Sequence, residues 1–249
     1  MSSVRVERDG AVLRVTLARP ERRNAFDAAT IAELTAAFSD VGDDVRAVVL
    51  AGDGPAFCAG ADIEWQRASI DLTEDENAAD AERLLAMCEA IDGCAAPVVA
   101  RIHGYALGGG SGLACCADVT IAAPDAVFGF SEVRLGIVPA VISPFVFARI
   151  GAGAARRYFT TGERIDAATA LRIGLVHEVG DDLDAAVERA VAALLAGGPQ
   201  AVRAAKRLVR EQPEPAELPG LAARRRSSAE GQEGLRAFLE RRAPTWTSD

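Results

Sequence analysis

Short apolar runs that alternate with amphipathic segments dominate the first 130 residues of the chain. Patterns of buried strands fall at 47–51, 97–102 and 119–122, and apolar residues at helical spacing fall at about 28–41 and 78–92. This alternation is typical of βα crossover units, whose strands lie parallel in one sheet. The predicted fold class is therefore α/β.

The rest of the chain differs from this alternating part. Residues 4–17 alternate around Asp9-Gly10, which predicts a hairpin, and the polar stretch 67–77 predicts a mobile loop. From residue 143 onward the patterns are helical, at 143–150, 152–160, 166–173, 183–196, 199–211 and 228–242. We predict an α/β core over 1–195 and a C-terminal helical subdomain over 196–249.

Charge and cysteine content narrow the classes of function. A net charge of −9 over 249 residues argues against binding to nucleic acid or to an anionic membrane surface. Five cysteines without paired CxxC spacing and two histidines are poor material for zinc, so no metal is expected. The sequence shows neither a signal-peptide pattern nor an apolar run of membrane-spanning length. We expect a cytoplasmic protein with reduced, buried thiols and no membrane partner.

Two glycine-containing loops follow predicted strands. Ala59–Asp62 comes after the strand at 47–51, and Gly108–Gly110 comes after the strand at 97–102. Open α/β sheets bind ligands at the carboxyl ends of their parallel strands. Backbone N–H groups that converge from two such loops form an oxyanion hole, which stabilises charge on a carbonyl oxygen. The structural alternative is a tight turn or close helix packing, which glycine also permits.

Glu132 is the candidate acid/base of the chain. It lies in Phe130–Pro139, a largely apolar segment, where loss of hydration raises the pKa of a carboxyl group. A pKa closer to neutrality suits a carboxyl group to proton transfer. The alternative is a structural ion pair with nearby Arg134.

Seven stretches match one family pattern in order along nearly the whole chain. They are 19–26, 56–63, 103–110 (His-Gly-Tyr-Ala-Leu-Gly-Gly-Gly), 131–136 (Ser-Glu-Val-Arg-Leu-Gly), 155–163, 170–176 and 234–244. In these stretches the chain resembles the enoyl-CoA hydratase/isomerase (crotonase) superfamily. The resemblance implies a crotonase-like spiral core of repeated ββα units, an acyl-CoA thioester substrate, and assembly as a homotrimer or a dimer of trimers. Since coenzyme A is part of the substrate, no separate cofactor is implied.

The resemblance also assigns roles to residues. The backbone N–H groups of Ala61 and Gly109 would hold the thioester carbonyl and stabilise an enolate, with Glu132 as acid/base. Coenzyme A would lie along two loops, on Arg23, Asn24, Ala25, Ala59, Asp62 and Ile63. Arg241 and Arg242 have two interpretations: contacts to phosphate groups, from a neighbouring subunit, or a solvated helix face.

The chain departs from the family pattern at Gly112. The best-known hydratases carry the first of two catalytic glutamates at this position, so only Glu132 is left here. One carboxylate is compatible with hydration, with isomerisation of an enoyl-CoA double bond, or with decarboxylation. Ala140 stands where dienoyl-CoA isomerases and aryl-CoA dehalogenases need an aspartate, which argues against both.

Finer details resemble bacterial methylglutaconyl-CoA hydratases of leucine breakdown, which also carry glycine at the position of Gly112. We therefore favour an enoyl-CoA hydratase, with a branched or carboxylated acyl group such as 3-methylglutaconyl as one option. A delta isomerase with a single glutamate is the first alternative. A non-catalytic acyl-CoA-binding protein is the second.

Overall fold

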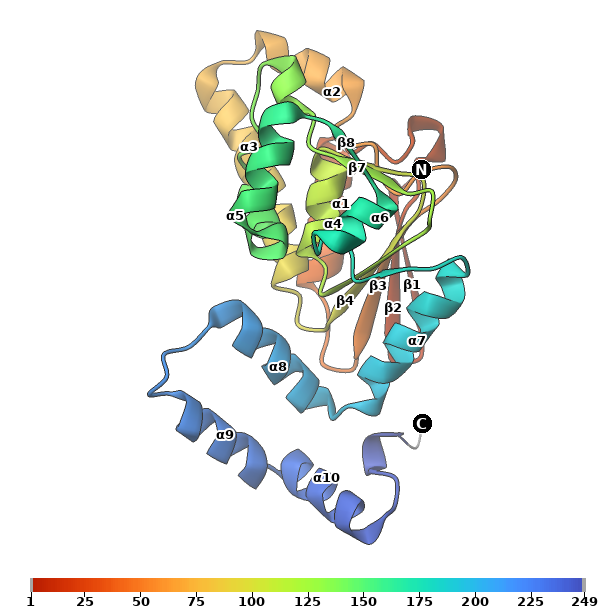
Figure 1. The fold of residues 1–249 in the computed structure, drawn as a ribbon, viewed down its shortest axis with the longest axis vertical. Helices are drawn as coiled ribbons and strands as arrows, with labels where there is room; N and C mark the ends of the chain where they lie inside the picture. Colours follow the sequence, from red (N-terminus) through yellow and green to blue (C-terminus); the bar gives the residue numbers. More distant parts are fainter. Residues whose placement is uncertain (1, 248–249) are drawn as a thin grey trace.

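The structure is a computed structural model and describes residues 2–247 (Figure 1). Its larger sheet has six strands in the order β1-β2-β3-β4-β6-β9. These are β1 (Val4–Asp9), β2 (Val12–Leu17), β3 (Ala47–Gly52), β4 (Val98–Ile102), β6 (Val119–Ala122) and β9 (Glu178–Val179). Strands β1 and β2 form the predicted antiparallel hairpin, and every later pairing in this sheet is parallel, as predicted.

A second sheet of three short strands lies beside the first. It has the order β5-β7-β8, formed by β5 (Tyr105–Leu107), β7 (Val127–Gly129) and β8 (Arg164–Asp166). Residues 127–130 form a short apolar run that predicts the strand β7, whereas β5 and β8 were not predicted, because neither lies in such a run and three residues are too few to show a period of two. Strand β5 carries the chain from the larger sheet into the second glycine loop.

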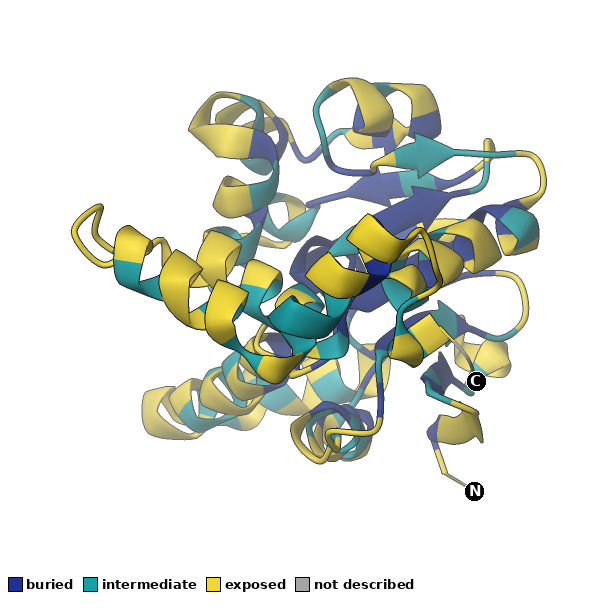
Figure 2. Cartoon of the chain, turned by 90° about the horizontal axis from the view of Figure 1, so that it is seen from below, coloured by how far each residue is buried: buried dark blue, intermediate teal, exposed yellow. Residues whose placement is uncertain are grey.

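Helices cover both faces of the larger sheet (Figures 1 and 2). On one face lie α1 (Ala28–Ser39), α3 (Glu74–Asp92), α4 (Gly109–Cys116) and α5 (Ser143–Thr161), whose buried side chains share one core cluster with Val48 and Leu50. On the other face α7 (Leu183–Ala196) packs against Ala47 and Val49. Successive residues of β3 thus face opposite layers, as side chains of a strand must. All five cysteines are free and buried, as predicted.

Two helices occupy the stretch predicted as a mobile loop. Helix α2 (Ile63–Ala68) is followed by a 3₁₀ turn (Ser69–Asp71), and α3 begins at Glu74 rather than near residue 78. A capping box explains this earlier start, because the Thr73 and Glu76 side chains each pair with the other's backbone N–H. The prediction of a loop over 67–77 was therefore wrong for most of that stretch. The helix-start signal was present in its polar residues.

The C-terminal helices lie at one end of the molecule (Figure 1). They are α8 (Pro199–Glu211), α9 (Leu218–Ser227) and α10 (Ala229–Glu240). Helix α6 (Ala167–Arg172) belongs instead to the α/β part of the chain. Helix α8 coincides with its predicted range, while α9 was missed among three prolines. Lys206 joins α8 to the core through Asp118 (2.8 Å). Across residues 2–247, no helix combines the length and apolar character needed to cross a bilayer.

Candidate active site

A cavity of about 350 Å³ lies where the two glycine loops meet α2, α3 and the segment after β7. The loops contribute Ala61, Gly108 and Gly109, and the 3₁₀ helix η3 (Glu132–Leu135) contributes Glu132. The other walls are largely apolar: Phe26, Trp65, Leu84, Leu107, Leu135, Ile137, Val138, Pro139, Ala140, Val141 and Ile142. The structure therefore brings the three predicted catalytic positions into one cavity.

The backbone at Ala61 is fixed by hydrogen bonds of its neighbours Gly60 and Asp62, whereas the Ala61 N–H group makes no hydrogen bond among the described residues. Phe26 pairs with Ala61 as in a parallel ladder: the Phe26 N–H donates to Gly60 O (2.9 Å), and the Asp62 N–H donates to Phe26 O (2.9 Å). In such a pairing the N–H of the central residue points away from the partner. Within residues 2–247 the Ala61 N–H has no hydrogen-bond acceptor.

Gly109 supplies the second free N–H group. It is the first residue of α4, so its N–H has no acceptor in the preceding turn, and the positive end of the helix dipole adds to it. A Cβ at Gly60 would lie 3.8 Å from the Gly109 nitrogen, which shows how closely the loops approach each other. A Cβ at Gly109 itself would lie 2.4 Å from Phe26 Cζ. Glycine is therefore required there by packing.

Glu132 faces the loops with one buried carboxylate oxygen that has no hydrogen-bond partner. Its Oε1 would lie 3.2 Å from a Cβ on Gly108, and its Oε2 is buried without a hydrogen-bond partner. Burial raises the pKa of Glu132 above its ordinary value of 4.5. Among the described residues no ion pair joins Glu132 to Arg134, so the structural alternative was wrong. A buried carboxyl group without a partner is costly, and such groups are typical of sites that move protons.

Gly112 lies one turn into α4, and the space beside it is filled. A Cβ at Gly112 would lie 2.4 Å from Ile142 Cγ2 and 2.9 Å from Ile142 Cβ. Ile142 is itself buried and lines the cavity. The isoleucine thus occupies the place toward which a side chain at residue 112 would extend, so a second carboxylate there would need another residue at 142.

The loop predicted to hold coenzyme A is built around Asn24. Arg23 and Asn24 both have left-handed backbone conformations (φ 51° and 55°). The buried Asn24 amide donates to Asp53 O and Ala56 O, each at 2.7 Å, so its side chain shapes the loop. The Ala59 N–H donates to Arg23 O (3.0 Å), which joins this loop to the first glycine loop.

The other residues of the predicted coenzyme A surface differ in exposure. Ile63 is exposed at the start of α2, whereas Ala25 is buried. Asp62 is buried, pairs with Arg19 (3.0 Å), and accepts a hydrogen bond from the Glu64 N–H (2.9 Å). The Asp62 carboxylate therefore caps α2 and fixes the first glycine loop.

Tyr105 is a residue of this surface that sequence reasoning missed. Its half-exposed ring lies beside two guanidinium groups, that of Arg23 at 6.0 Å and that of Arg164 at 5.8 Å. Arg164 comes from β8, which pairs with β7 next to β5. The cluster depends on the small second sheet, so no local pattern in the sequence could have indicated it.

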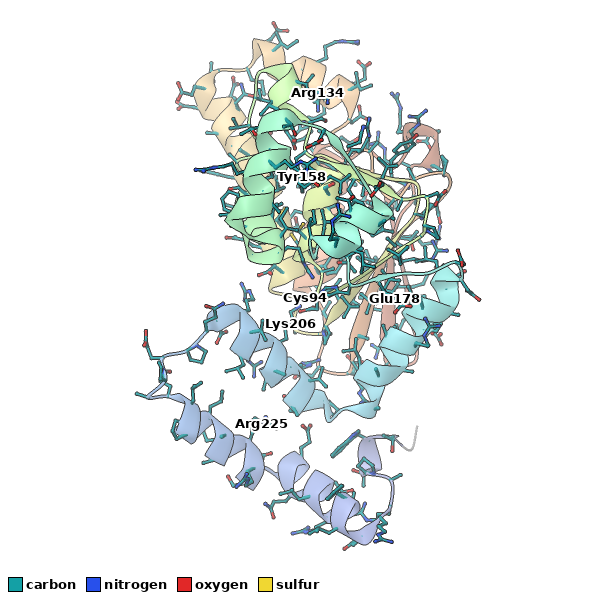
Figure 3. All side chains as sticks on the ribbon, viewed as in Figure 1. Cys94, Arg134, Tyr158, Glu178, Lys206 and Arg225 are labelled. Carbon is teal, nitrogen blue, oxygen red and sulfur yellow. The ribbon has the colours of Figure 1, made fainter. Side chains whose placement is uncertain are left out.

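Arg241 and Arg242 lie far from this chain's own cavity. Arg242 pairs with Glu233 (2.7 Å) and Glu240 (2.7 Å) at the end of α10. Figure 3 shows Arg134, beside the cavity, and Arg225, on α9, at opposite ends of the long axis of the molecule. Contacts from these arginines to a bound phosphate would therefore have to come from another subunit.

Comparison with known proteins decides the family. Residues 7–249 match the model of the family described as enoyl-CoA hydratase/isomerase. The chain belongs to this family. A protein of Rhodobacter capsulatus described as a probable enoyl-CoA hydratase is 38% identical over 255 residues, which cover 98% of each chain. As a member of the hydratase/isomerase family, the protein is an enzyme.

Solved structures support the same assignment. The chain resembles an enoyl-CoA hydratase of Shewanella pealeana with a TM-score of 0.91 and 38% identity, covering 98% of this chain and 96% of that one. It resembles AtuE of Pseudomonas aeruginosa with a TM-score of 0.94 and 38% identity, covering 99% and 100% of the two chains. The predicted crotonase-like α/β fold is thereby confirmed.

The contact between Gly112 and Ile142 makes a prediction for this family member. Gly112→Ala is expected to lower stability by about 1–3 kcal/mol, because the added methyl group overlaps a buried side chain. Ile142→Ala is itself destabilising, but Gly112→Ala should cost less in that background than in the wild type, and urea unfolding of the two single variants and the double variant measures this coupling. If the free-energy changes of the two single variants simply add in the double variant, the contact with Ile142 does not limit the size of residue 112.

Proposed function

We propose that the enzyme adds water to the double bond of a trans-2-enoyl-CoA thioester. One observation carries this proposal: the unpaired Glu132 carboxylate shares a cavity with the free N–H groups of Ala61 and Gly109. These two donors would bind the thioester oxygen and stabilise the charge that develops on it. Glu132 would then act as the acid/base that takes up and returns the proton.

In this mechanism one carboxylate acts twice. Glu132 takes a proton from water as the hydroxyl oxygen attacks C3, and the electron pair of the double bond moves onto the thioester oxygen. The resulting enolate collapses when Glu132 returns the proton to C2. The product is a 3-hydroxyacyl-CoA, and the thioester bond is intact throughout, so the reaction needs no cofactor besides the coenzyme A of its substrate.

Isomerisation of an enoyl-CoA double bond is the second candidate. The observation that favours it is Ile142, whose side chain fills the space beside Gly112, so that among residues 2–247 Glu132 is the one glutamate lining the cavity. A single base that moves a proton between C2 and C4 requires no bound water. Hydration would pass through the enolate of a 3-hydroxyacyl thioester and isomerisation through a dienolate, and the same two donors would hold the thioester oxygen of either one.

A turnover screen distinguishes these functions. Crotonyl-CoA, 3-hexenoyl-CoA and 3-methylglutaconyl-CoA would each be incubated with the enzyme and followed by mass spectrometry. Hydration adds the mass of one water, isomerisation changes retention without a change in mass, and decarboxylation releases carbon dioxide. Absence of any product with all three would instead support an acyl-CoA-binding protein without catalysis.

The pH dependence should report on Glu132 directly. A general base must be ionised, and burial disfavours its ionised form, so activity should fall as the pH drops through a pKa above 4.5. The measurement is kcat/KM for crotonyl-CoA between acid and neutral pH. An acidic limb at or below the ordinary glutamate value would contradict Glu132 as the base.

We further propose a homotrimer or dimer of trimers in the cytoplasm, with residues 196–249 as its helical trimerisation subdomain. Phe238 and Leu239 on α10 are 79% and 77% exposed, and exposed apolar side chains of this kind favour association. The free cysteines support a reducing compartment. Sedimentation should give a mass three or six times that of the chain, and a monomer would contradict the assembly.

A further inference from the structure

The wall of the cavity formed by α3 carries a charge that the proposed chemistry does not use. Asn77, Asp80, Ala81 and Leu84 line the cavity, and their spacing places them on one face of the helix. The same face continues through Met87 into the core. Asp80 is therefore a charged residue on a helix face that otherwise leads into the core, where an apolar residue would be usual.

We propose that Asp80 makes this cavity selective for uncharged acyl groups, so that acyl chains ending in a carboxylate are rejected. The inference rests on the proposed function, since it concerns the acyl group of the same thioester. It narrows the substrate class that the resemblance to methylglutaconyl-CoA hydratases leaves open.

The charge of the lining carries the argument. Of the residues that line the cavity, only Glu132 and Asp80 have charged side chains, and both are acidic. No lysine, arginine or histidine is among the lining residues in the described part of the chain. A distal carboxylate would thus enter a largely apolar space that is lined by two carboxylates and by no cation, an arrangement in which like charges repel strongly.

Arg83 does not reverse this conclusion. Its guanidinium pairs with Asp80 one helical turn away, but the Arg83 side chain is 56% exposed whereas that of Asp80 is 15% exposed. Arg83 therefore lies on the solvent side of the pair and is absent from the lining. The ion pair holds Asp80 in position, and Asp80 remains among the residues that line the cavity.

Neighbouring polar groups are neutral. Gln66 and Ser69 line the same part of the cavity, and the Ser69 hydroxyl donates to Gln66 O (2.7 Å). The side-chain amide of Asn77 is likewise engaged in a hydrogen bond within the protein, since it donates to Thr73 O (3.1 Å) and fixes the turn before α3. These neutral groups offer no ionic partner for an anion.

Two acyl-CoA thioesters of nearly equal shape test the proposal. Glutaconyl-CoA ends in a carboxylate, and 5-methyl-2-hexenoyl-CoA replaces that carboxylate with an uncharged isopropyl group. The wild-type enzyme should show a kcat/KM at least about 10-fold lower for glutaconyl-CoA. Asp80→Asn should reduce the ratio of the two kcat/KM values about 10-fold. Glu82→Gln makes an equal charge change on an exposed residue of α3 and should leave this ratio unchanged.

A binding arm separates this proposal from the proposed reaction. Calorimetry with the saturated pair glutaryl-CoA and 5-methylhexanoyl-CoA requires no turnover, and the same preference and the same Asp80→Asn shift are expected. If neither unsaturated thioester reacts but the binding preference holds, hydration fails and the selectivity stands. Equal or tighter binding of glutaryl-CoA, or a ratio unchanged in Asp80→Asn, would overturn the role of Asp80.

Discussion

Glu132→Gln is expected to lower kcat for hydration of crotonyl-CoA by about 10²–10⁴-fold, the usual contribution of a positioned acid/base. Glutamine keeps the shape of the side chain and removes the group that takes and returns the proton. Ile142 blocks the neighbouring position, and no other glutamate lines the cavity to take over. The effect should therefore appear in kcat, with little change in KM.

The stability of the same variant gives an independent check. Because the pKa of Glu132 is raised in the folded state, the native protein binds more protons than the unfolded chain above pH 4.5. Ionisation of Glu132 therefore lowers the free energy of unfolding as the pH rises through the folded-state pKa. Below the unfolded-state pKa, Glu132 is protonated in both states and this loss is absent. Glu132→Gln removes this loss, so its Tm at neutral pH should equal or exceed that of the wild type.

Arg134→Gln is the matched control. Arg134 is exposed in the same 3₁₀ helix and is not paired with Glu132, so its loss should leave kcat nearly unchanged. A large fall in kcat for Arg134→Gln, or full activity in Glu132→Gln, would show that the proton-transfer role has been assigned to the wrong residue.

The chemical positions of this site were predictable because they depend on local sequence. Glycines after two strands mark places where backbone N–H groups are free, and a glutamate among apolar residues is desolvated wherever that segment packs. Helix α8 and the β1–β2 hairpin were predictable for the same reason, through periodicity and turn residues. The local pattern indicated the two glycine loops and Glu132, and the family resemblance named Ala61 and Gly109 as the proposed oxyanion donors; the fold brings all three positions into one cavity.

The shape of the acyl cavity was not predictable in this way. The contact between Gly112 and Ile142 joins α4 to the residue just before α5, and the cluster around Tyr105 joins three separate segments. Asp80 lies in the helix predicted at about 78–92, whose spacing does not single it out, and only the packing of α3 places it in the lining of the cavity. The proposed selectivity thus depends on long-range packing, while the proposed catalytic positions lie in motifs that are local in the sequence.

The backbone donors can be tested through packing, because no substitution removes an N–H group without adding a proline ring. Gly109→Ala is expected to lower kcat by about 10²–10³-fold, the usual cost of losing one oxyanion donor. The new methyl group would lie 2.4 Å from Phe26 Cζ, and the Phe26 ring is buried against Trp65 at 6.2 Å between centroids. The ring cannot withdraw, so the start of α4 must move and carry its N–H away from the thioester oxygen.

Phe26→Leu supplies the rescue that distinguishes a displaced donor from general damage. Leucine lacks the Cζ atom that the methyl group meets, so the Gly109→Ala/Phe26→Leu double variant should recover a large part of kcat over Gly109→Ala alone. Gly153→Ala in α5, where an added Cβ meets nothing within 4 Å, should leave kcat unchanged. If Gly109→Ala retained wild-type kcat with a correctly folded core, the N–H of Gly109 would not be a donor, and stabilisation of the enolate would have to come from Ala61 alone.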